Sequence, residues 1–452
     1  MRITFFGGAG GVTGANHLLE IRKTKLIVDC GLFQSGQFVD ELNKQNFAYD
    51  PASLNYALIT HAHLDHVGRL PKLYKEGFRG KILATPPTID ITRLILEDSC
   101  RILEYESSKN KNEKPFTCMP EVEKVMKLFE PVHYRKPYPL SSTAIATFYD
   151  AGHILGSSMI EIKDKKEKKT IIFSGDFGNI DKPILNDPTQ IEEADFVVVE
   201  SAYGNRIHES DRSKKFLLGK LFIETVKKKG VLMIPAFSIE RTQELLYYFN
   251  SLVEKHGFKP IPTFLDSPLA IKITQVFKKY PEYYDSEAYC LVNEGDDFLQ
   301  FPGLKLTETT QESKNIFRVV GPKIIIAGSG MMHAGRILNH MINYLPGKNN
   351  TLLIVGFQVR GSIGRKLLDG ATSVRIHGEE IPVRARITAI GAMSAHGDSN
   401  MLLRWVKNIK GVKRVFTVQG DPEAANYLAN RINKNTKAKA MAPGLGYSEE
   451  LV

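Results

Sequence analysis

Short apolar runs separated by turns dominate the first 60 residues of the chain. The runs RITFFGG, NHLLEIRK, KLIVDCG and YALITH are typical of successive strands. A second strand-rich stretch covers 143–200, with TAIATFYDAG, SSMIEIK, KTIIFSGD and ADFVVVES. Apolar residues at helical spacing predict helices near 68–76 and over 88–107. Two groups of strands flanked by helices predict an α/β/β/α layering.

After Tyr203 the pattern changes to strand–loop–helix alternation, which favours a doubly wound parallel α/β domain. Examples are GVLMIPAF, followed by a helical pattern, and KIIIAGSG, followed by another. From about residue 383 strands return with VRARITAIG and RVFTVQG, each followed by a helical pattern. We therefore predict one αββα domain, split into 1–204 and 371–452, with a second α/β domain inserted at 205–370.

Composition sets limits on the class of protein. The 452 residues carry a formal charge of +10, with a pI of about 9.1, which suits a polyanionic partner such as nucleic acid but does not prove one. The four cysteines lie far apart and form no CxxC pair, as in a reduced cytosolic protein. The N-terminus has no signal-peptide pattern and the chain has no 18-residue apolar span, so we expect a cytoplasmic location and no membrane contact.

The segment THAHLDHVG at 60–68 concentrates metal-binding side chains, namely His61, His63, Asp65 and His66. It directly follows the apolar strand NYALIT, so these side chains lie at a strand end, where they can converge on one point. Neutral imidazoles and carboxylates are the usual protein ligands of zinc. A polar loop with hydrogen-bonded histidines is the alternative, and the density of ligand types disfavours it.

Further ligand types occur at the ends of other predicted strands. His153 lies in YDAGHILGSS, Asp176 in IIFSGDFG, and Asp29 in KLIVDCG. Asp29 suits a supporting role, in which its carboxylate orients a ligand histidine through a hydrogen bond. Each residue alone is a weak signal, but their joint occurrence indicates a metal site.

These residues resemble the ligand pattern of the metallo-β-lactamase superfamily. The resemblance implies that His61, His63 and His153 hold one zinc ion, that Asp65 and His66 hold a second, and that Asp176 bridges the two. Later motifs resemble the β-CASP nucleases of the RNA-processing type, such as the cleavage and polyadenylation endonuclease and its bacterial relatives. These motifs are Glu200 in VVVESAYGNR, PAFSIERTQE at 235–244, DSPLA at 266–270, GSGMMHAGR at 328–336, GFQVRGSIGRKLL at 356–368, and His396 in SAHGD.

The resemblance implies a zinc-dependent ribonuclease that cleaves single-stranded RNA, as an endonuclease or also as a 5′-exonuclease. Two zinc ions would activate a shared water as a hydroxide that attacks phosphorus. Asp65 would ligate one ion and accept a proton, and His396 would protonate the leaving oxygen with Glu200 fixing its tautomer. The alternative for the last pair is a polar loop histidine and a charge at a strand end. The sequence does not decide between RNA and DNA, or between endonuclease and exonuclease action.

Polar residues in and near the inserted domain suit the phosphodiester backbone. We expect phosphate contacts from a set of arginines and serines in motif loops, where guanidinium groups and helix-start N–H groups attract phosphate. Structural salt bridges are the alternative for each arginine. The set is Arg206, Arg241, Ser329, Arg336 and Ser394.

The glycine-rich segment GGAGGVTG at 7–14 is not a dinucleotide-binding loop. Its glycines do not match the G-x-G-x-x-G spacing, and the NHLLEIRK that follows reads as a strand, not as a helix. The family resemblance implies instead a glycine turn near the metal cleft, with His17 close by.

Position 419 breaks the family pattern. RNA-processing members carry a histidine there that completes the second zinc site, whereas this chain has Gln419 in FTVQGDPEA. One interpretation is an active enzyme whose second zinc is weakly held, because an amide oxygen is a poorer zinc ligand than imidazole. The others are an RNA-binding scaffold with little activity, and a hydrolase of DNA or of a small ester or thioester. The oligomeric state also stays open, a homodimer included.

Overall fold

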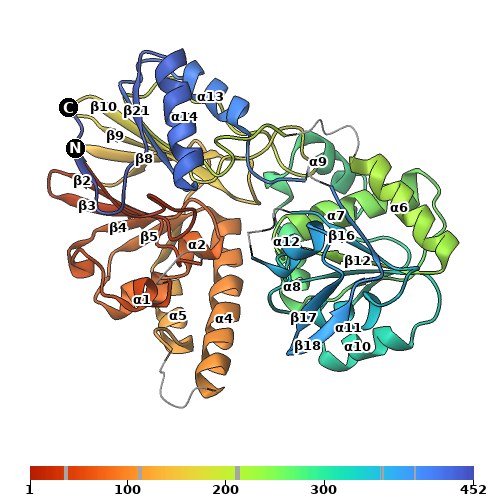
Figure 1. Ribbon diagram of the computed structural model, residues 1–452. Helices are drawn as coiled ribbons and strands as arrows, with labels where there is room; N and C mark the ends of the chain where they lie inside the picture. The colour runs from red at the N-terminus through yellow and green to blue at the C-terminus, as the bar shows by residue number, and fades with distance from the viewer. Residues whose placement is uncertain (35–38, 110–114, 209–213, 357, 359–360, 391–392) are drawn as a thin grey trace. The chain divides into compact units, whose positions relative to one another are not determined.

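The computed structural model describes the chain except for residues 35–38, 110–114, 209–213, 357, 359–360 and 391–392. The chain divides into two compact units, drawn in Figure 1. The first unit comprises residues 1–207 and 396–452, and the second comprises residues 208–395. The sequence prediction placed the domain boundaries after residues 204 and 370.

The first unit contains two seven-stranded sheets. One sheet has the order β22-β1-β2-β3-β4-β5-β6, antiparallel from β22 to β3 and parallel from β3 to β6. Its strands are β1 (Arg2–Gly7), β2 (Asn16–Ile21), β3 (Thr24–Val28), β4 (Tyr56–Leu58), β5 (Lys81–Ala84), β6 (Phe129–Pro131) and β22 (Ser448–Glu450).

The other sheet has the order β21-β20-β11-β10-β9-β8-β7, parallel from β21 to β10 and antiparallel from β10 to β7. Its strands are β7 (Tyr138–Pro139), β8 (Ala144–Asp150), β9 (Ser158–Asp164), β10 (Lys169–Phe173), β11 (Phe196–Glu200), β20 (Arg414–Val418) and β21 (Lys439–Met441).

The inner strands of both sheets are largely buried on both faces, which explains their nearly continuous apolar sequences, whereas the edge strands β6, β7, β21 and β22 are partly exposed. In β10, Ile171 and Phe173 join the core between the two sheets, together with Phe5 of β1. Ile172 points to the opposite face and packs in a second core with Leu402. Successive side chains of a strand face opposite ways, so one apolar run serves both cores.

Helices cover the two outer faces and complete the αββα sandwich, as the sequence predicted. The first sheet packs against helices between β3 and β6, and the second against two helices near the C-terminus. The first group is α2 (Leu64–Val67), α3 (Leu70–Lys75), α4 (Pro86–Lys109) and α5 (Met119–Met126); α1 (Val39–Lys44) and a 3₁₀ turn at Pro51–Ser53 lie in the same part of the chain. The second group is α13 (Ser399–Asn408) and α14 (Pro422–Asn435).

The second unit is built on a six-stranded sheet of order β14-β13-β15-β12-β16-β19, parallel throughout. Figure 1 shows α6 and α7 on one side of this sheet and α10 and α11 on the other, as expected for a doubly wound domain. The strands are β12 (Val231–Pro235), β13 (Thr263–Leu265), β14 (Leu304–Leu306), β15 (Lys323–Ala327), β16 (Thr351–Ile354) and β19 (Arg386–Ala389), and β17 (Ser373–Ile376) forms a hairpin with β18 (Glu379–Pro382). The helices are α6 (Lys214–Lys228), α7 (Arg241–Asn250) with a π-helical end at Ser251–Lys255, α8 (Pro268–Lys279), α9 (Ser286–Asn293), α10 (Thr310–Asn315), α11 (Ile337–Tyr344) and α12 (Ile363–Leu368), with 3₁₀ turns at Pro281–Tyr283 and Ile316–Arg318.

Strand β19 differs from the sequence prediction in its place. The prediction assigned VRARITAIG to the closing part of the first domain, whereas Arg386–Ala389 pairs in parallel with β16 of the second unit. The apolar pattern identifies a strand but not its partner, because pairing depends on residues distant in sequence. Within the described parts of the chain, no helix combines the length and hydropathy that a membrane span requires.

Candidate metal centre

The predicted metal ligands lie after the ends of strands from both sheets of the first unit. His61 follows β4, His63 precedes the one-turn helix α2, and Asp176 follows β10. His153 lies in the turn between β8 and β9. Strands β8 and β10 run in the same direction, because each is antiparallel to β9. The turns after them therefore open at one edge of the sheet, as in other α/β sites at strand ends.

His61, His63, His153 and Asp176 converge on one point, and their ligand atoms all lie within 4.8 Å of one another. His63 Nδ1 lies 3.0 Å from His61 Nε2 and 3.2 Å from His153 Nε2. Asp176 Oδ2 lies 3.4 Å from both Nε2 atoms. Ligands about 2.1 Å from a tetrahedral metal ion lie roughly 3.4 Å apart, so this donor set fits a divalent metal ion.

The electrostatics of these side chains also suit a metal ion. Burial lowers the pKa of His63 and of His153 well below the usual histidine value, which keeps both imidazoles neutral. Burial alone would raise the pKa of Asp176, but His66 and His61 outweigh it and hold that pKa well below its usual range. Neutral imidazoles and an ionised carboxylate are the forms that ligate metal ions.

Asp29 lies where the sequence predicted a supporting carboxylate. Its Oδ2 is 2.7 Å from His66 Nδ1 and accepts the Thr60 hydroxyl at 2.8 Å, and its Oδ1 accepts the Thr60 backbone N–H at 2.8 Å. The backbone of Asp29 is left-handed, with φ +62°, a conformation that Asp and Asn tolerate better than most residues. Thr60 also contacts His61 Nδ1 at 3.0 Å. Thr60 was not among the predicted site residues, and its place directly before the histidine cluster is the signal that could have identified it.

Asp65, His66 and Gln419 lie beside this cluster. His66 Nε2 is 3.3 Å from Asp176 Oδ1 and 3.9 Å from Asp65 Oδ2. Gln419 follows β20 and is buried, and its side-chain amide nitrogen is 2.8 Å from His66 Nε2. The same nitrogen donates a hydrogen bond to Asp176 Oδ1 at 3.0 Å. The structure thus brings Gln419 into the centre as a hydrogen-bonding group.

Glu200 and His396 form a second, adjacent group with Asp176. His396 Nδ1 lies 2.9 Å from Glu200 Oε2 and 3.9 Å from Asp176 Oδ2. Burial lowers the pKa of His396, but the carboxylates of Glu200 and Asp176 outweigh it and raise that pKa to about 9. The Tyr203 ring lies 5.9 Å from the His396 ring, a contact that the sequence analysis did not anticipate.

His17 lies close to the centre, as expected from the sequence. It stacks on Phe173 and lines a water-sized buried cavity with Asp29 and Gln419. Burial lowers the pKa of His17 to about 4. Its neutral imidazole therefore contributes to the wall of the site and not to the positive charge.

The arginines predicted to contact phosphate are held in different ways. In the second unit, Arg336 Nη1 donates to Asp266 Oδ1 at 2.7 Å, and Arg241 is buried and paired with Glu244. Arg206 is exposed in the first unit, with its guanidinium 6.0 Å from the Tyr203 ring. Their phosphate-binding roles stay predictions, and that of Arg206 agrees best with its exposure.

The predicted serines lie in loops of the second unit. Ser329 donates from both its backbone N–H and its hydroxyl to Ala334 O at 3.1 Å. The sequence predicted that Ser329 opens a helix. The next helix, α11, begins only at Ile337, so Ser329 does not lie at a helix N-terminus. Ser394 is buried two residues before His396. Phosphate contacts of Ser329 and Ser394 therefore stay predictions.

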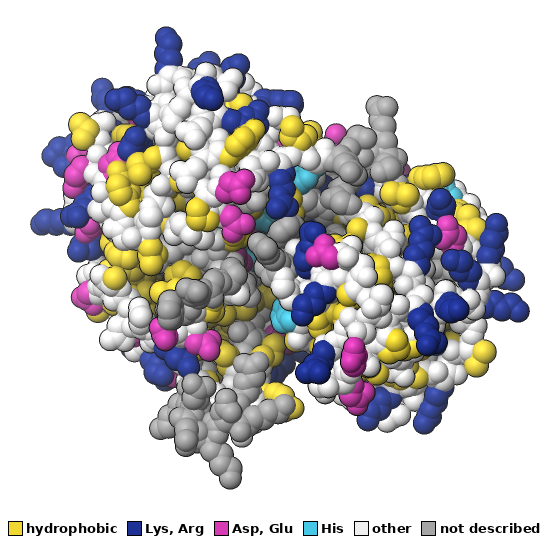
Figure 2. All heavy atoms as spheres, in the orientation of Figure 1, with side chains coloured by type: hydrophobic (Ala, Val, Ile, Leu, Met, Phe, Trp, Pro, Cys, Tyr) yellow, Lys and Arg dark blue, Asp and Glu magenta, His cyan; other side chains and the backbone are white. Residues whose placement is uncertain are grey.

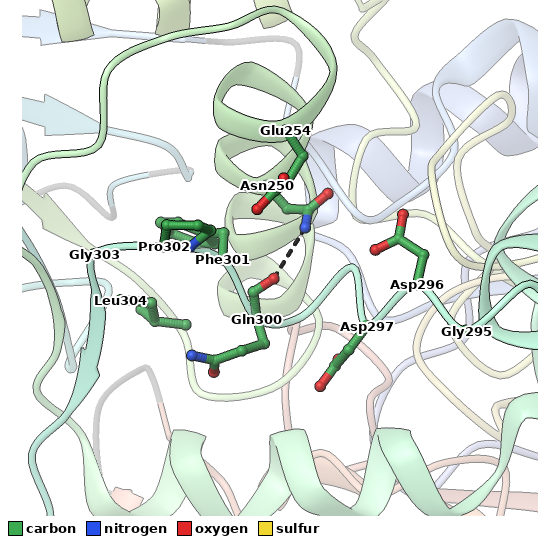
Figure 3. Close-up of a pocket in the computed structure, with 10 residues that line it drawn as sticks. All are labelled: Asn250, Glu254, Gly295, Asp296, Asp297, Gln300, Phe301, Pro302, Gly303 and Leu304. Carbon is green, nitrogen blue, oxygen red and sulfur yellow. Dashed lines mark hydrogen bonds between the residues drawn. The ribbon is translucent and has the colours of Figure 1, made fainter.

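Basic side chains are spread over the surface of both units, as Figure 2 shows. Lys227 and Lys228 at the end of α6 form an exposed run with Lys229, the residue that follows the helix. A cavity of about 610 Å³ lies elsewhere in the second unit and is drawn in Figure 3. Its lining includes Glu254, Asp296 and Asp297. Three carboxylates repel a phosphodiester backbone, so this cavity does not suit an RNA strand.

An αββα core whose strand ends carry converging histidine and aspartate ligands is the architecture of a metal-dependent hydrolase. Three family models match the chain: a metallo-beta-lactamase superfamily domain at residues 18–200, a Beta-Casp domain at 242–367, and a Zn-dependent metallo-hydrolase RNA specificity domain at 380–443.

Similar proteins extend over almost the whole chain. Ribonuclease TTHA0252 of Thermus thermophilus is 36% identical over 425 residues, which is 94% of each chain. An RNase J-like protein of Methanocaldococcus jannaschii is 27% identical and covers 98% of each chain. The transcription termination factor FttA of Methanosarcina mazei is 27% identical, with 98% of this chain matching 70% of that one. A crystal structure of a protein of unknown function from Enterococcus faecalis shares the fold, with a TM-score of 0.58, 12% identity and 99% of each chain covered.

This chain therefore belongs to the β-CASP family of the metallo-β-lactamase superfamily, as the sequence motifs predicted.

Proposed function

We propose that this protein is a zinc-dependent ribonuclease that hydrolyses phosphodiester bonds of single-stranded RNA. The observation that carries the proposal is the convergence of four metal ligands next to the Glu200–His396 pair. A similar protein that covers 94% of the chain is named a ribonuclease, and the family model over residues 380–443 is described as an RNA specificity domain.

Zinc suits the first donor set because its three imidazoles and one carboxylate are common zinc ligands. His61, His63, His153 and Asp176 would hold this ion. Bound there, it would supply an activated water near neutral pH and neutralise charge on the phosphate. The resemblance predicts a second zinc ion at Asp65 and His66, and the residue at position 419 weakens that prediction.

Two residues beside the metal ligands would carry out the two proton transfers of hydrolysis. Asp65 is partly exposed, with 19% of its side chain accessible, and would accept a proton from the attacking water. His396 would donate a proton to the leaving oxygen. Glu200 holds His396 through Nδ1, which leaves Nε2 to act as the acid.

The substrate would be a polyanion, in agreement with the net charge of +10. Arg206 is the best-placed candidate for a phosphate contact in the first unit because it is exposed. The guanidinium of Arg336 is committed to Asp266 and to two backbone carbonyls, those of Thr307 and Glu308. We therefore assign Arg336 a smaller part in RNA binding than its sequence motif implied.

Cleavage of end-labelled single-stranded RNA, DNA of the same sequence and a small thioester tests the proposal. The variants are Asp65→Ala and, as a control, Asp40→Ala, which removes an exposed carboxylate of α1. We expect wild type and Asp40→Ala to cleave RNA and Asp65→Ala to lose most of this activity.

Equal cleavage by wild type and Asp65→Ala would overturn the proposal. Binding of RNA without cleavage would support the scaffold alternative, and turnover of DNA or thioester alone would support the alternative substrates. Products from RNA labelled at either end distinguish endonuclease from 5′-exonuclease action. The cytoplasmic location and a homodimer stay predictions.

A further inference from the structure

The side chain of Gln419 faces the position at which a second metal ion would bind. Such an ion would have to share two donor atoms, Nε2 of His66 and Oδ1 of Asp176, which lie 3.3 Å apart. The amide nitrogen of Gln419 already lies 2.8 Å from the first atom and 3.0 Å from the second. Since an amide nitrogen donates hydrogen bonds and does not ligate metal ions, Gln419 is not arranged as a ligand.

The carboxylate of Asp176 is divided between two partners. Its Oδ2 lies 3.4 Å from the Nε2 atoms of both His61 and His153, on the side of the three-histidine cluster. Its Oδ1 accepts the hydrogen bond from Gln419. One oxygen is therefore available to a metal ion, and the other is satisfied by an amide N–H with its partial positive charge.

Asp65 does not make up for the missing ligand. Its Oδ2 lies 3.9 Å from His66 Nε2, whereas Asp176 Oδ2 in the first site lies 3.4 Å from Nε2 of His61 and of His153. Among the residues that the structure describes, the groups of ligand atoms lying within 4.8 Å of one another include neither Asp65 nor His66. The second set of donors is thus more open than the first.

Backbone contacts hold Gln419 in this place. Its backbone N–H donates to Gly8 O at 2.6 Å, its φ is +51°, and the residue is only 4% exposed. A Cβ atom at Gly8 would lie 3.0 Å from Gln419 Cγ, so the glycine turn leaves the space that this side chain needs. The side-chain amide of Gln419 is therefore held in a fixed position within the centre.

We propose that the centre is built for a single metal ion and that the amide of Gln419 takes the place of the second. A second ion would have to displace the hydrogen bond to Asp176 and turn the amide to offer its oxygen, a poor zinc ligand. The inference rests on the proposed function for the identity of the ion, but it concerns only the number of ions bound.

Metal content tests the inference without reference to activity. Wild type, Gln419→His and Gln419→Glu are loaded with zinc, dialysed against metal-free buffer and analysed for zinc per chain by mass spectrometry. Gln275→His, which adds a histidine at an exposed position of α8, is the control. We expect one tightly bound ion in wild type and in the control, and two in Gln419→His and Gln419→Glu, because imidazole and carboxylate ligate zinc.

Two tightly bound ions in wild type would overturn the inference, and this result does not depend on whether any variant folds. An unchanged count of one ion in both folded Gln419 variants would also overturn the assigned role of Gln419. RNA cleavage, measured on the same samples, distinguishes the two proposals. One ion without cleavage contradicts the ribonuclease function alone, and cleavage with two ions in wild type contradicts the single-ion centre alone.

Discussion

Nδ1 of His396 lies 2.9 Å from Oε2 of Glu200, although 196 residues separate the two in sequence. Glu200 ends β11 in the first half of the chain, and His396 begins the segment that returns to the same unit. A carboxylate on Nδ1 fixes the tautomer and the orientation of the imidazole, so the other ring nitrogen can act as an acid.

Substitution of either member of this pair should slow the reaction without removing metal. We expect His396→Ala to lower kcat for RNA cleavage by about 10²–10⁴-fold, the usual contribution of a general acid. Glu200→Gln should cause a smaller loss, because the amide oxygen can still accept from Nδ1. Single-turnover kinetics with parallel zinc analysis measures both quantities. An unchanged kcat in His396→Ala would mean that another group protonates the leaving oxygen.

Removal of a first-site ligand should abolish metal binding and lower stability. His153→Ala should lose its zinc, and its melting temperature should no longer rise when zinc is added. For wild type, an ion present at 100 times its Kd adds about 2.7 kcal/mol to the free energy of unfolding. His133→Ala, at an exposed position, is the control and should keep both properties. Zinc-dependent stabilisation of His153→Ala equal to that of wild type would contradict the assigned ligand set.

Asp29 should contribute to stability through charge and through turn geometry, and two substitutions separate these contributions. Asp29→Ala leaves the buried donors of Thr60 without their acceptor, at a cost of about 1–3 kcal/mol for each unsatisfied group. Asp29→Asn should cost less, since Asn tolerates the left-handed backbone and its amide oxygen accepts one of these bonds. Urea unfolding compares them, and equal losses in both variants would show that the charge alone matters.

Asp266 should make the second unit sensitive to acid. Burial raises the pKa of Asp266, but hydrogen bonds from His340, Ser313, Arg336 and Thr307 outweigh it and lower that pKa from 3.8 to about 2. A depressed pKa stabilises the fold above the unfolded-state value, and this stabilisation is lost as the pH falls from about 4 towards 2. The shift corresponds to ~2 kcal/mol in the free energy of unfolding.

Unfolding of wild type and Asp266→Asn between pH 2 and pH 7 measures this contribution. Wild type should lose ~2 kcal/mol more than Asp266→Asn over the acid range, because Asn does not titrate. Glu294→Gln, which removes an exposed carboxylate of the same unit, should follow wild type. Parallel pH profiles for wild type and Asp266→Asn would contradict the buried network.

The metal ligands could be predicted from the sequence because each depends on a local pattern. An apolar strand followed directly by His61 and His63, or by Asp176, places ligand side chains at a strand end. The αββα layering could also be predicted from the sequence, since strands buried on both faces have continuous apolar sequences. Both the ligand positions and the layering depend on residues close together in sequence, so they can be read directly from the chain.

Other features depend on contacts between distant residues, which a local pattern does not contain. Arg336 looked available for phosphate, but Asp266, 70 residues away, binds its guanidinium. VRARITAIG was recognisable as a strand, but its pairing with β16 was not. Competition between side chains for the same partner is decided only when the chain is folded.

Position 419 shows both what the sequence determines and what depends on the folded structure. The sequence by itself determined that a glutamine stands where the family has a histidine, and hence that the second metal site departs from the family pattern. Only the tertiary structure decided that the amide nitrogen, not the oxygen, lies toward Asp176 and His66. The physical reason is that a glutamine can present either atom, and the carboxylate oxygen of Asp176, brought there from another strand, selects the donor.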